Sequence, residues 1–235
     1  MLSFIIPAYN EARCLPATLT ALRQAASVIG QAHEIIVVDD ASTDGTADVA
    51  IAHGADVMRV EHRHIAATRN AGAAHAHGDI LFFIDADTCI DANVVLAALR
   101  ALDSGAVGGG ATVRLQGEPA WHAHWATAVI MWMLRVAKIA PGCFVYCTRT
   151  AFDATGGFDQ TLYAAEDVAI SRALAKQGRF VMLRETVATS DRKLRTFSLG
   201  EHLALMFRFA FLGKRMLRSR KNLKLWYEDR RDDER

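Results

Sequence analysis

Two aspartates separated by one alanine directly follow a short apolar run in the first half of the sequence. The run is Ile80–Ile84, and the aspartates are Asp85 and Asp87. Side chains alternate along an extended chain, so residues i and i+2 point the same way and both carboxylates can converge on one hard cation. A strand-ending aspartate can instead cap the next helix. The repeated carboxylate at this spacing favours a metal site.

Two other predicted strands also end in polar or acidic residues. The first is followed by Pro7–Glu11, PAYNE, and the second, Glu34–Asp40, ends in Asp39 and Asp40. Ligands of open α/β sheets bind beyond the carboxyl ends of the strands. These three strand ends together predict one ligand site at this edge of the sheet.

The elements that position these residues alternate between strand and helix with short connections. A strand over Leu2–Ile6 should stop at Pro7, and a helix should open at Asn10 with its leucines on one face. Further strands are expected over Glu34–Asp40, Ala55–Val60, Ile80–Ile84, Ala106–Leu115 and Phe144–Cys147, and further helices over Thr46–His53, Ile65–Ala76 and Val168–Gln177. This alternation predicts a parallel, right-handed, Rossmann-like half. Because no GxGxxG follows the first strand, dinucleotide binding is not supported.

Composition narrows the class of protein. The 235 residues are 51% hydrophobic and 23% charged, as in a globular chain with a large core, and the net charge of +1 argues against a general nucleic-acid binder. The four cysteines lack zinc-type spacing and no signal peptide is evident, so free thiols in the cytoplasm are expected. No apolar stretch reaches the roughly 18 residues that span a bilayer.

Six blocks of sequence resemble the family 2 glycosyltransferases with the GT-A fold, in order and spacing. They are FIIPAYNEA, EIIVVDDASTDGT, ATRNAG, GDILFFIDADT, GGFD and the pair Glu166–Asp167. The resemblance covers roughly residues 2–190. It implies an α/β GT-A fold with a mostly parallel central sheet flanked by helices, with a nucleotide-binding half at 1–100 and an acceptor half at 101–190. Residues 191–235 would form a basic, amphipathic C-terminal extension.

The resemblance also implies which residues bind the nucleotide. Asp40 would accept a hydrogen bond from the base, for which an acceptor-rich side chain is suited. Arg69 would lie near the base or phosphates, although a solvent-facing helical arginine is the alternative. The nucleotide-binding residues implied in this way are Pro7, Ala8, Tyr9, Glu11, Asp40, Arg69, Ala86 and Asp87.

The metal and the catalytic base follow from the same resemblance. Asp87 and Asp85 would hold Mn²⁺ or Mg²⁺ against the two phosphates of the donor. Asp167, or as second choice Glu166, would be the base that deprotonates an acceptor hydroxyl, and one displacement would invert the anomeric centre. Both acids also suit the first turn of a helix because of its dipole. The two interpretations are compatible.

Two amphipathic stretches leave the acceptor and the partners open. Trp121–Lys138 is rich in Trp and Met and suits a core or homodimer helix, or a helix that contacts acceptor or membrane. Leu203–Lys224 suits a helix on an anionic membrane surface, or one packed on the domain with a basic outer face. Arg192 and Lys193 could contact the diphosphate or form a solvated loop.

The sequence predicts transfer of a single sugar, because the QxxRW motif of processive members is absent. The donor would be a nucleotide-sugar, with UDP favoured, and the acceptor a hydroxyl of a glycan or a lipid-linked molecule. The enzyme would be cytoplasmic, with peripheral attachment to the inner face of the membrane as an open question. A non-catalytic nucleotide-sugar-binding scaffold and a sugar-1-phosphate nucleotidyltransferase are the alternatives.

Overall fold

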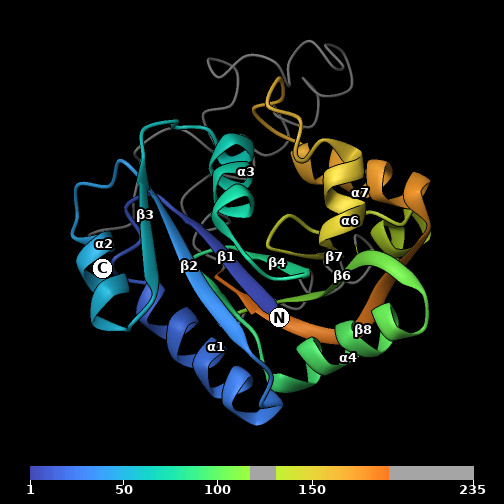
Figure 1. Cartoon of the computed structure of the whole chain (residues 1–235), viewed down its shortest axis with the longest axis horizontal. Helices are drawn as coiled ribbons and strands as arrows, with labels where there is room; N and C mark the ends of the chain where they lie inside the picture. Colours follow the sequence, from blue (N-terminus) through green and yellow to red (C-terminus); the bar gives the residue numbers. More distant parts are fainter. Residues whose placement is uncertain (117–130, 191–235) are drawn as a thin grey trace.

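The computed structural model describes residues 1–116 and 131–190. In these ranges an eight-stranded sheet has the strand order β3-β2-β1-β4-β7-β6-β8-β5, with helices on both faces (Figure 1). The strands are β1 (Leu2–Ala8), β2 (His33–Asp40), β3 (Asp56–Val60), β4 (Ile80–Ile84), β5 (Thr88–Cys89), β6 (Ala106–Leu115), β7 (Phe144–Thr148) and β8 (Arg179–Thr189). The helices are α1 (Leu15–Ile29), α2 (Thr46–Ala52), α3 (Ile65–His75), α4 (Ala92–Asp103), α6 (Arg149–Thr155) and α7 (Glu166–Gln177).

The first four strands of the chain are parallel, and β7 then pairs with β4 in the antiparallel sense. The carboxyl ends of β1, β2 and β4 therefore lie at one edge of the sheet. Phe4 and Phe82 face the layer of α1, α2 and α4, whereas Ile5 and Phe83 face the layer of α3, α6 and α7 (Figure 1). Burial on both faces explains why β4 is an unbroken apolar run.

Two predicted boundaries at the start of the chain were wrong. β1 does not stop at Pro7 but continues to Ala8. Its pairing with β4 ends at Ile5, so Pro7 has only β2 as a neighbour, and a missing N–H is tolerated there as on an edge strand. The first helix begins at Leu15, not at Asn10, which has a left-handed φ of 50°.

The three glycines of β6 allow neighbouring segments to approach its backbone closely. A Cβ on Gly109 would lie 1.8 Å from the carbonyl oxygen of Val181 on β8, so no larger residue fits there. Beyond β6, residues 131–137 are helical. Arg135 fastens this helix to the sheet, because its guanidinium donates to the carbonyl oxygens of Met182 and Leu183 and to Thr112 Oγ1.

Several predicted segments lie outside the described ranges. They are residues 121–130 of the Trp121–Lys138 stretch and the whole extension at 191–235, including Arg192, Lys193 and Leu203–Lys224. Within the described part of the chain, no helix has both the length and the hydropathy needed to cross a membrane.

Candidate functional site

The loops after β1 and β2 are bound to each other at the carboxyl edge of the sheet. The backbone N–H of Asn10 donates to Ser42 Oγ at 2.8 Å, and the Asn10 side chain accepts from Thr43 N at 2.7 Å. The N–H of Glu11 donates to Thr46 Oγ1 at 2.8 Å. The segments Pro7–Glu11 and Asp39–Asp44, which the sequence placed at one site, are therefore in direct contact.

Asp40 is buried and organises the turn between β3 and α3. Its carboxylate accepts from the backbone N–H groups of His62 at 2.6 Å, Arg63 at 2.7 Å and His64 at 3.1 Å, and from Thr68 Oγ1 at 2.8 Å. These four bonds match the acceptor capacity of a carboxylate. The predicted contact of Asp40 with a nucleobase stays a prediction.

This turn carries two side chains that the sequence reasoning missed. The guanidinium carbon of Arg63 lies 3.5 Å from the centre of the Tyr9 ring, and the His64 ring lies 4.5 Å from the ring of Tyr163. Burial lowers the pKa of His64, which favours the neutral imidazole. The signal that could have found both residues was the strand-end rule itself, because residues 61–64 follow β3 as the other loops follow β1, β2 and β4.

Arg69 lies at the centre of the site and is 2% exposed. Its Nη2 donates to Asp85 Oδ1 and to the Gly142 carbonyl oxygen, and its Nη1 donates to Glu166 Oε1, each at 2.8 Å. Burial alone would lower its pKa, but the two carboxylates outweigh burial and hold the pKa above its ordinary value. The alternative of a solvent-facing Arg69 was therefore wrong.

The neighbouring acids of α7 have different environments. Glu166 is paired with Arg69, whereas Asp167 Oδ1 accepts from the N–H of Val168 at 2.8 Å. Burial, and then the negative charge of Glu166, raise the pKa of Asp167 to about 6. Ala165, just before them, has a left-handed φ of 61°, a strained conformation for a residue with a Cβ. The two neighbouring acids therefore differ: Glu166 is paired with a cation, whereas Asp167 has a raised pKa.

The two aspartates after β4 supply oxygen ligands that suit Mg²⁺ or Mn²⁺. Asp85 is 26% exposed and uses Oδ1 to bind Arg69. Asp87 Oδ1 accepts from Thr189 Oγ1 at 3.3 Å, which places the end of β8 beside it. Among the residues with described positions, no group of three or more His, Cys, Asp or Glu side chains could hold a metal. A metal here would need ligands in addition to Asp85 and Asp87.

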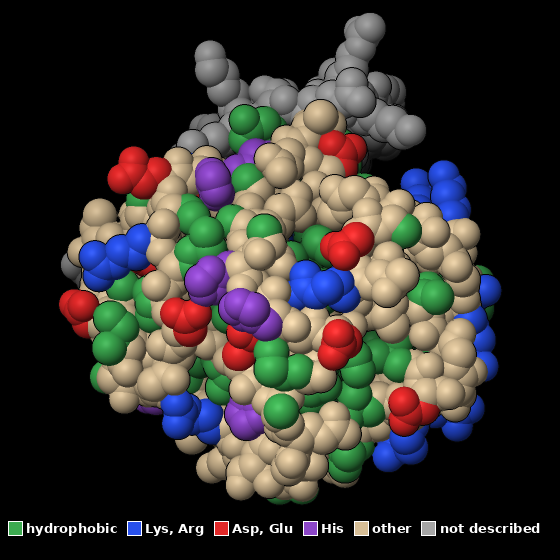
Figure 2. Space-filling view, viewed as in Figure 1, with side chains coloured by type: hydrophobic (Ala, Val, Ile, Leu, Met, Phe, Trp, Pro, Cys, Tyr) green, Lys and Arg blue, Asp and Glu red, His purple; other side chains and the backbone are tan. Residues whose placement is uncertain are grey.

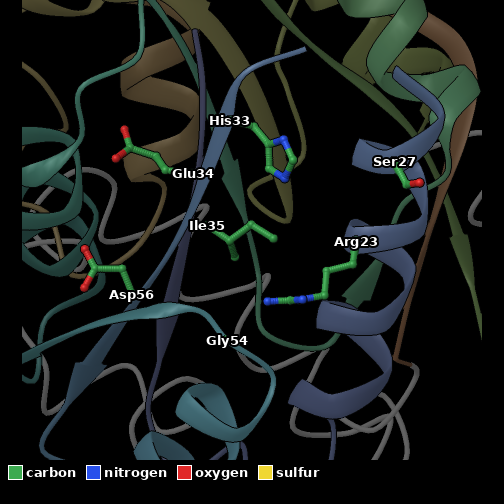
Figure 3. Close-up of a pocket in the computed structure, with 7 residues that line it drawn as sticks. All are labelled: Arg23, Ser27, His33, Glu34, Ile35, Gly54 and Asp56. Atoms are coloured by element: carbon green, nitrogen blue, oxygen red, sulfur yellow. The ribbon is translucent and has the colours of Figure 1, made fainter. Parts of the chain in front are cut away.

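A cavity of about 380 Å³ lies away from these loops, at the start of β2 and β3 (Figure 3). It is lined by Arg23, Ser27, His33, Glu34, Ile35, Gly54 and Asp56. Two exposed histidines beside it each bind an acid: His75 lies 2.7 Å from Asp56 and His77 lies 3.1 Å from Glu34. Figure 2 shows histidines beside acidic side chains on this face of the molecule. The cavity is at the amino ends of its strands, so it does not belong to the candidate site.

The family model for "Glycosyl transferase family 2" matches residues 3–158. The chain belongs to this family. Curated relatives include the uncharacterized glycosyltransferases Rv0539 of Mycobacterium tuberculosis and Mb0553 of Mycobacterium bovis. Each is 33% identical over 143 residues, which cover 58% of this chain and 61% of the relative. The match therefore spans only about three fifths of the length of these relatives.

Solved structures share the fold of this family 2 chain. TarS residues 1–349 from S. aureus superposes with a TM-score of 0.64 at 16% identity, over 96% of this chain and 77% of TarS. Mannosyltransferase PcManGT from Pyrobaculum calidifontis, in complex with GDP-Man and Mn²⁺, gives 0.60 at 23% identity, over 88% and 64%. Glucosyl-3-phosphoglycerate synthase from Mycobacterium tuberculosis, in complex with Mn²⁺ and UDP, gives 0.59 at 20% identity, over 88% and 76%. The GT-A fold expected from the sequence is confirmed.

Proposed function

We propose that this family 2 glycosyltransferase moves a single sugar from a nucleotide-sugar to a hydroxyl acceptor, with inversion at the anomeric carbon. The observation that carries the proposal is the arrangement around Arg69. Its guanidinium joins Asp85, at the predicted metal and diphosphate position, to Glu166, beside the predicted base. The groups needed at the leaving group and at the attacking hydroxyl thus belong to one connected cluster.

In this proposal Asp167 is the catalytic base. A base must be ionised to take a proton and works best with a pKa near the working pH. The pKa of Asp167, raised to about 6, meets both conditions at pH 7, whereas Glu166 is held by Arg69. Asp167 takes the proton of the acceptor hydroxyl as that oxygen attacks the anomeric carbon from the face opposite the diphosphate. This single displacement inverts the configuration, by the logic of single-step glycosidases.

Asp87 and Asp85 would hold Mn²⁺ or Mg²⁺, which would supply Lewis-acid neutralisation of the charge on the departing diphosphate. Their all-oxygen donor set and partial exposure support this assignment. Tyr9 and the rest of the Pro7–Glu11 loop would bind the nucleoside. UDP is the favoured nucleotide, and TarS and glucosyl-3-phosphoglycerate synthase have been solved in complex with UDP.

The acceptor is proposed to be a hydroxyl of a glycan or of a lipid-linked molecule. The helix that would contact the acceptor or the membrane, or form a homodimer interface, is the one at 131–137. The support is the helix at 131–137, whose Trp132, Met133 and Val136 are 65%, 50% and 65% exposed. Exposed aromatic and aliphatic side chains of this kind suit an interface.

Thermal unfolding with nucleoside diphosphates, with and without Mn²⁺, tests the proposed donor site. A ligand at about 100 times its dissociation constant adds roughly 2.7 kcal/mol, which raises the Tm by several degrees. We expect a Mn²⁺-dependent shift with UDP that is lost in Asp87→Ala and retained in the control Asp103→Ala, an exposed acid at the end of α4. The proposal fails if no nucleoside diphosphate shifts the Tm. If nucleotide binds but no sugar donor is ever turned over, the scaffold alternative takes its place.

A further inference from the structure

Arg63 and Tyr9 come from different loops, and the guanidinium of Arg63 lies over the Tyr9 ring at the carboxyl edge of the sheet. Tyr9 follows β1 and Arg63 follows β3, and the guanidinium carbon lies 3.5 Å from the centre of the tyrosine ring. A guanidinium over an aromatic face is attracted by the ring and keeps its N–H groups free at its rim. The stacking therefore fixes the position of the cation without using its hydrogen-bond donors.

The guanidinium of Arg63 has no acceptor within residues 1–116 and 131–190. Neither a hydrogen bond nor an ion pair joins it to the described side chains or carbonyl groups there. Two other arginines, by contrast, are bound by protein acceptors: Arg69 binds two carboxylates, and Arg149 binds three carbonyl oxygens. Arg63 is also only partly exposed. The surrounding protein therefore restricts where its N–H groups can point.

The backbone of Arg63 is held in an unfavourable conformation by Asp40. Its φ is 49°, in the left-handed region, which is unfavourable for a residue with a Cβ. Its N–H donates to Asp40 Oδ1 at 2.7 Å, between the similar bonds from His62 and His64. Strain of this kind persists where the surrounding structure over-determines the conformation, and it clusters at ligand sites. The result is a cation presented at one defined place.

We propose that Arg63 is a nucleotide-binding residue whose guanidinium, held on the Tyr9 ring, donates hydrogen bonds to oxygen atoms of a bound nucleoside diphosphate. Asp40 is then a positioning residue that acts through the turn carrying Arg63. This inference rests on the proposed function, because it requires a nucleotide at the Tyr9 loop. Planar, always-charged donors suit phosphate oxygens and also base carbonyls.

Isothermal titration with UDP in the presence of Mn²⁺ tests the assignment. Hydrogen bonds from a charged group contribute about 1.5–3 kcal/mol, so we expect Arg63→Ala to weaken UDP binding roughly 10- to 100-fold. Arg63→Lys, which keeps the charge and loses the planar fork, should recover part of the loss. The matched control is Arg59→Ala, which removes an exposed positive charge from β3 and should change the affinity less than about twofold.

Parallel titration with uridine distinguishes the two acceptors. If Arg63→Ala loses affinity for UDP but not for uridine, the contact is with phosphate. If it loses affinity for both, the contact is with the nucleoside. The inference is overturned if Arg63→Ala binds UDP within about twofold of the wild type, or if Arg59→Ala loses as much. Failure of the proposed function would look different, since the wild type itself would then bind no nucleotide.

A double-mutant cycle tests the positioning role of Asp40. If Asp40 acts through Arg63, the loss of UDP affinity in Asp40→Asn should not add to that of Arg63→Ala in the double variant. Additive losses would mean that Asp40 contacts the nucleotide itself, and would overturn this part of the inference. A merely structural role of either residue would lower the unliganded Tm without producing this coupling in affinity.

Discussion

Arg69 Nη1 lies 2.8 Å from Glu166 Oε1, although the two residues are 97 positions apart in the sequence. This buried ion pair joins α3, which follows the loops proposed to bind the nucleotide, to α7, whose second residue is the proposed base Asp167. The same guanidinium also binds Asp85 at the end of β4. One cation therefore binds both the residue proposed for the donor side of the site and the helix that carries the proposed base.

Removal of this cation should damage both the fold and the activity. Arg69→Met leaves the buried Glu166 and the partly exposed Asp85 without a counter-charge, and breaking a buried pair in this way costs about 3–5 kcal/mol. Urea unfolding measures the loss of stability. In Arg69→Met/Glu166→Gln, which removes one orphaned charge, part of that stability should return. If Arg69→Met is as stable as the wild type, the ion pair between Arg69 and Glu166 does not contribute to stability.

The two aspartates after β4 should behave differently when each is replaced. Asp85→Ala deprives Arg69 of a partner, so we expect a loss of about 2 kcal/mol in the free energy of unfolding without ligand. Asp87 makes no contact with Arg69 of this kind, and Asp87→Ala should change unliganded stability by less than about 1 kcal/mol. Both variants should lose the Mn²⁺-dependent gain with UDP. Equal unliganded stabilities would contradict the division of roles.

The parts of the site that follow from local pattern were predictable, and the parts that depend on packing were not. The bounds of β4 and the position of Asp85 and Asp87 followed from an apolar run that ends in carboxylates. The burial of Arg69 could not be foreseen, because its partners come from three separate segments. Arg63 gave no local signal beyond its place after a strand, since its contact with Tyr9 depends on how two loops fold together.

Asp167 should make the protein less stable at neutral pH than an uncharged residue would. Its pKa in the folded chain is raised to about 6, so the protonated form is favoured on folding. Its contribution to stability is fully present below the unfolded pKa and is lost as the pH rises through 6. A shift of this size corresponds to about 3 kcal/mol. Asp167→Asn should therefore raise the Tm at pH 7.5, and the gain should shrink as the pH falls toward 4.

The same variant should have no transferase activity, because an amide cannot accept the hydroxyl proton. A gain in stability with a loss of activity is the expected signature of a strained catalytic group. Glu166→Gln serves as the comparison, since it should lose stability through Arg69 instead. An active Asp167→Asn would transfer the role of base to another residue.

The rate of sugar transfer should fall on the acid side of the pH profile as Asp167 becomes protonated. For the free enzyme, kcat/KM should decrease about tenfold for each pH unit below a midpoint near 6, which is the pKa of Asp167. The measurement is UDP release at fixed Mn²⁺ across pH 5 to 8. A midpoint near 4, the ordinary value for an aspartate, would mean that the base lies in a different environment from that of Asp167.

Ala165 stores strain next to the proposed base, and its replacement by glycine should relieve it. A left-handed φ of 61° costs roughly 1–2 kcal/mol for alanine and nothing comparable for glycine. The added flexibility of glycine in the unfolded chain offsets part of the gain, so Ala165→Gly should raise the free energy of unfolding by up to about 1 kcal/mol. Ala154, a residue of helix α6, provides the control, because Ala154→Gly should lower the free energy of unfolding by a similar amount. If Ala165→Gly is instead destabilising, the turn before α7 is held by its backbone hydrogen bonds without appreciable strain at residue 165.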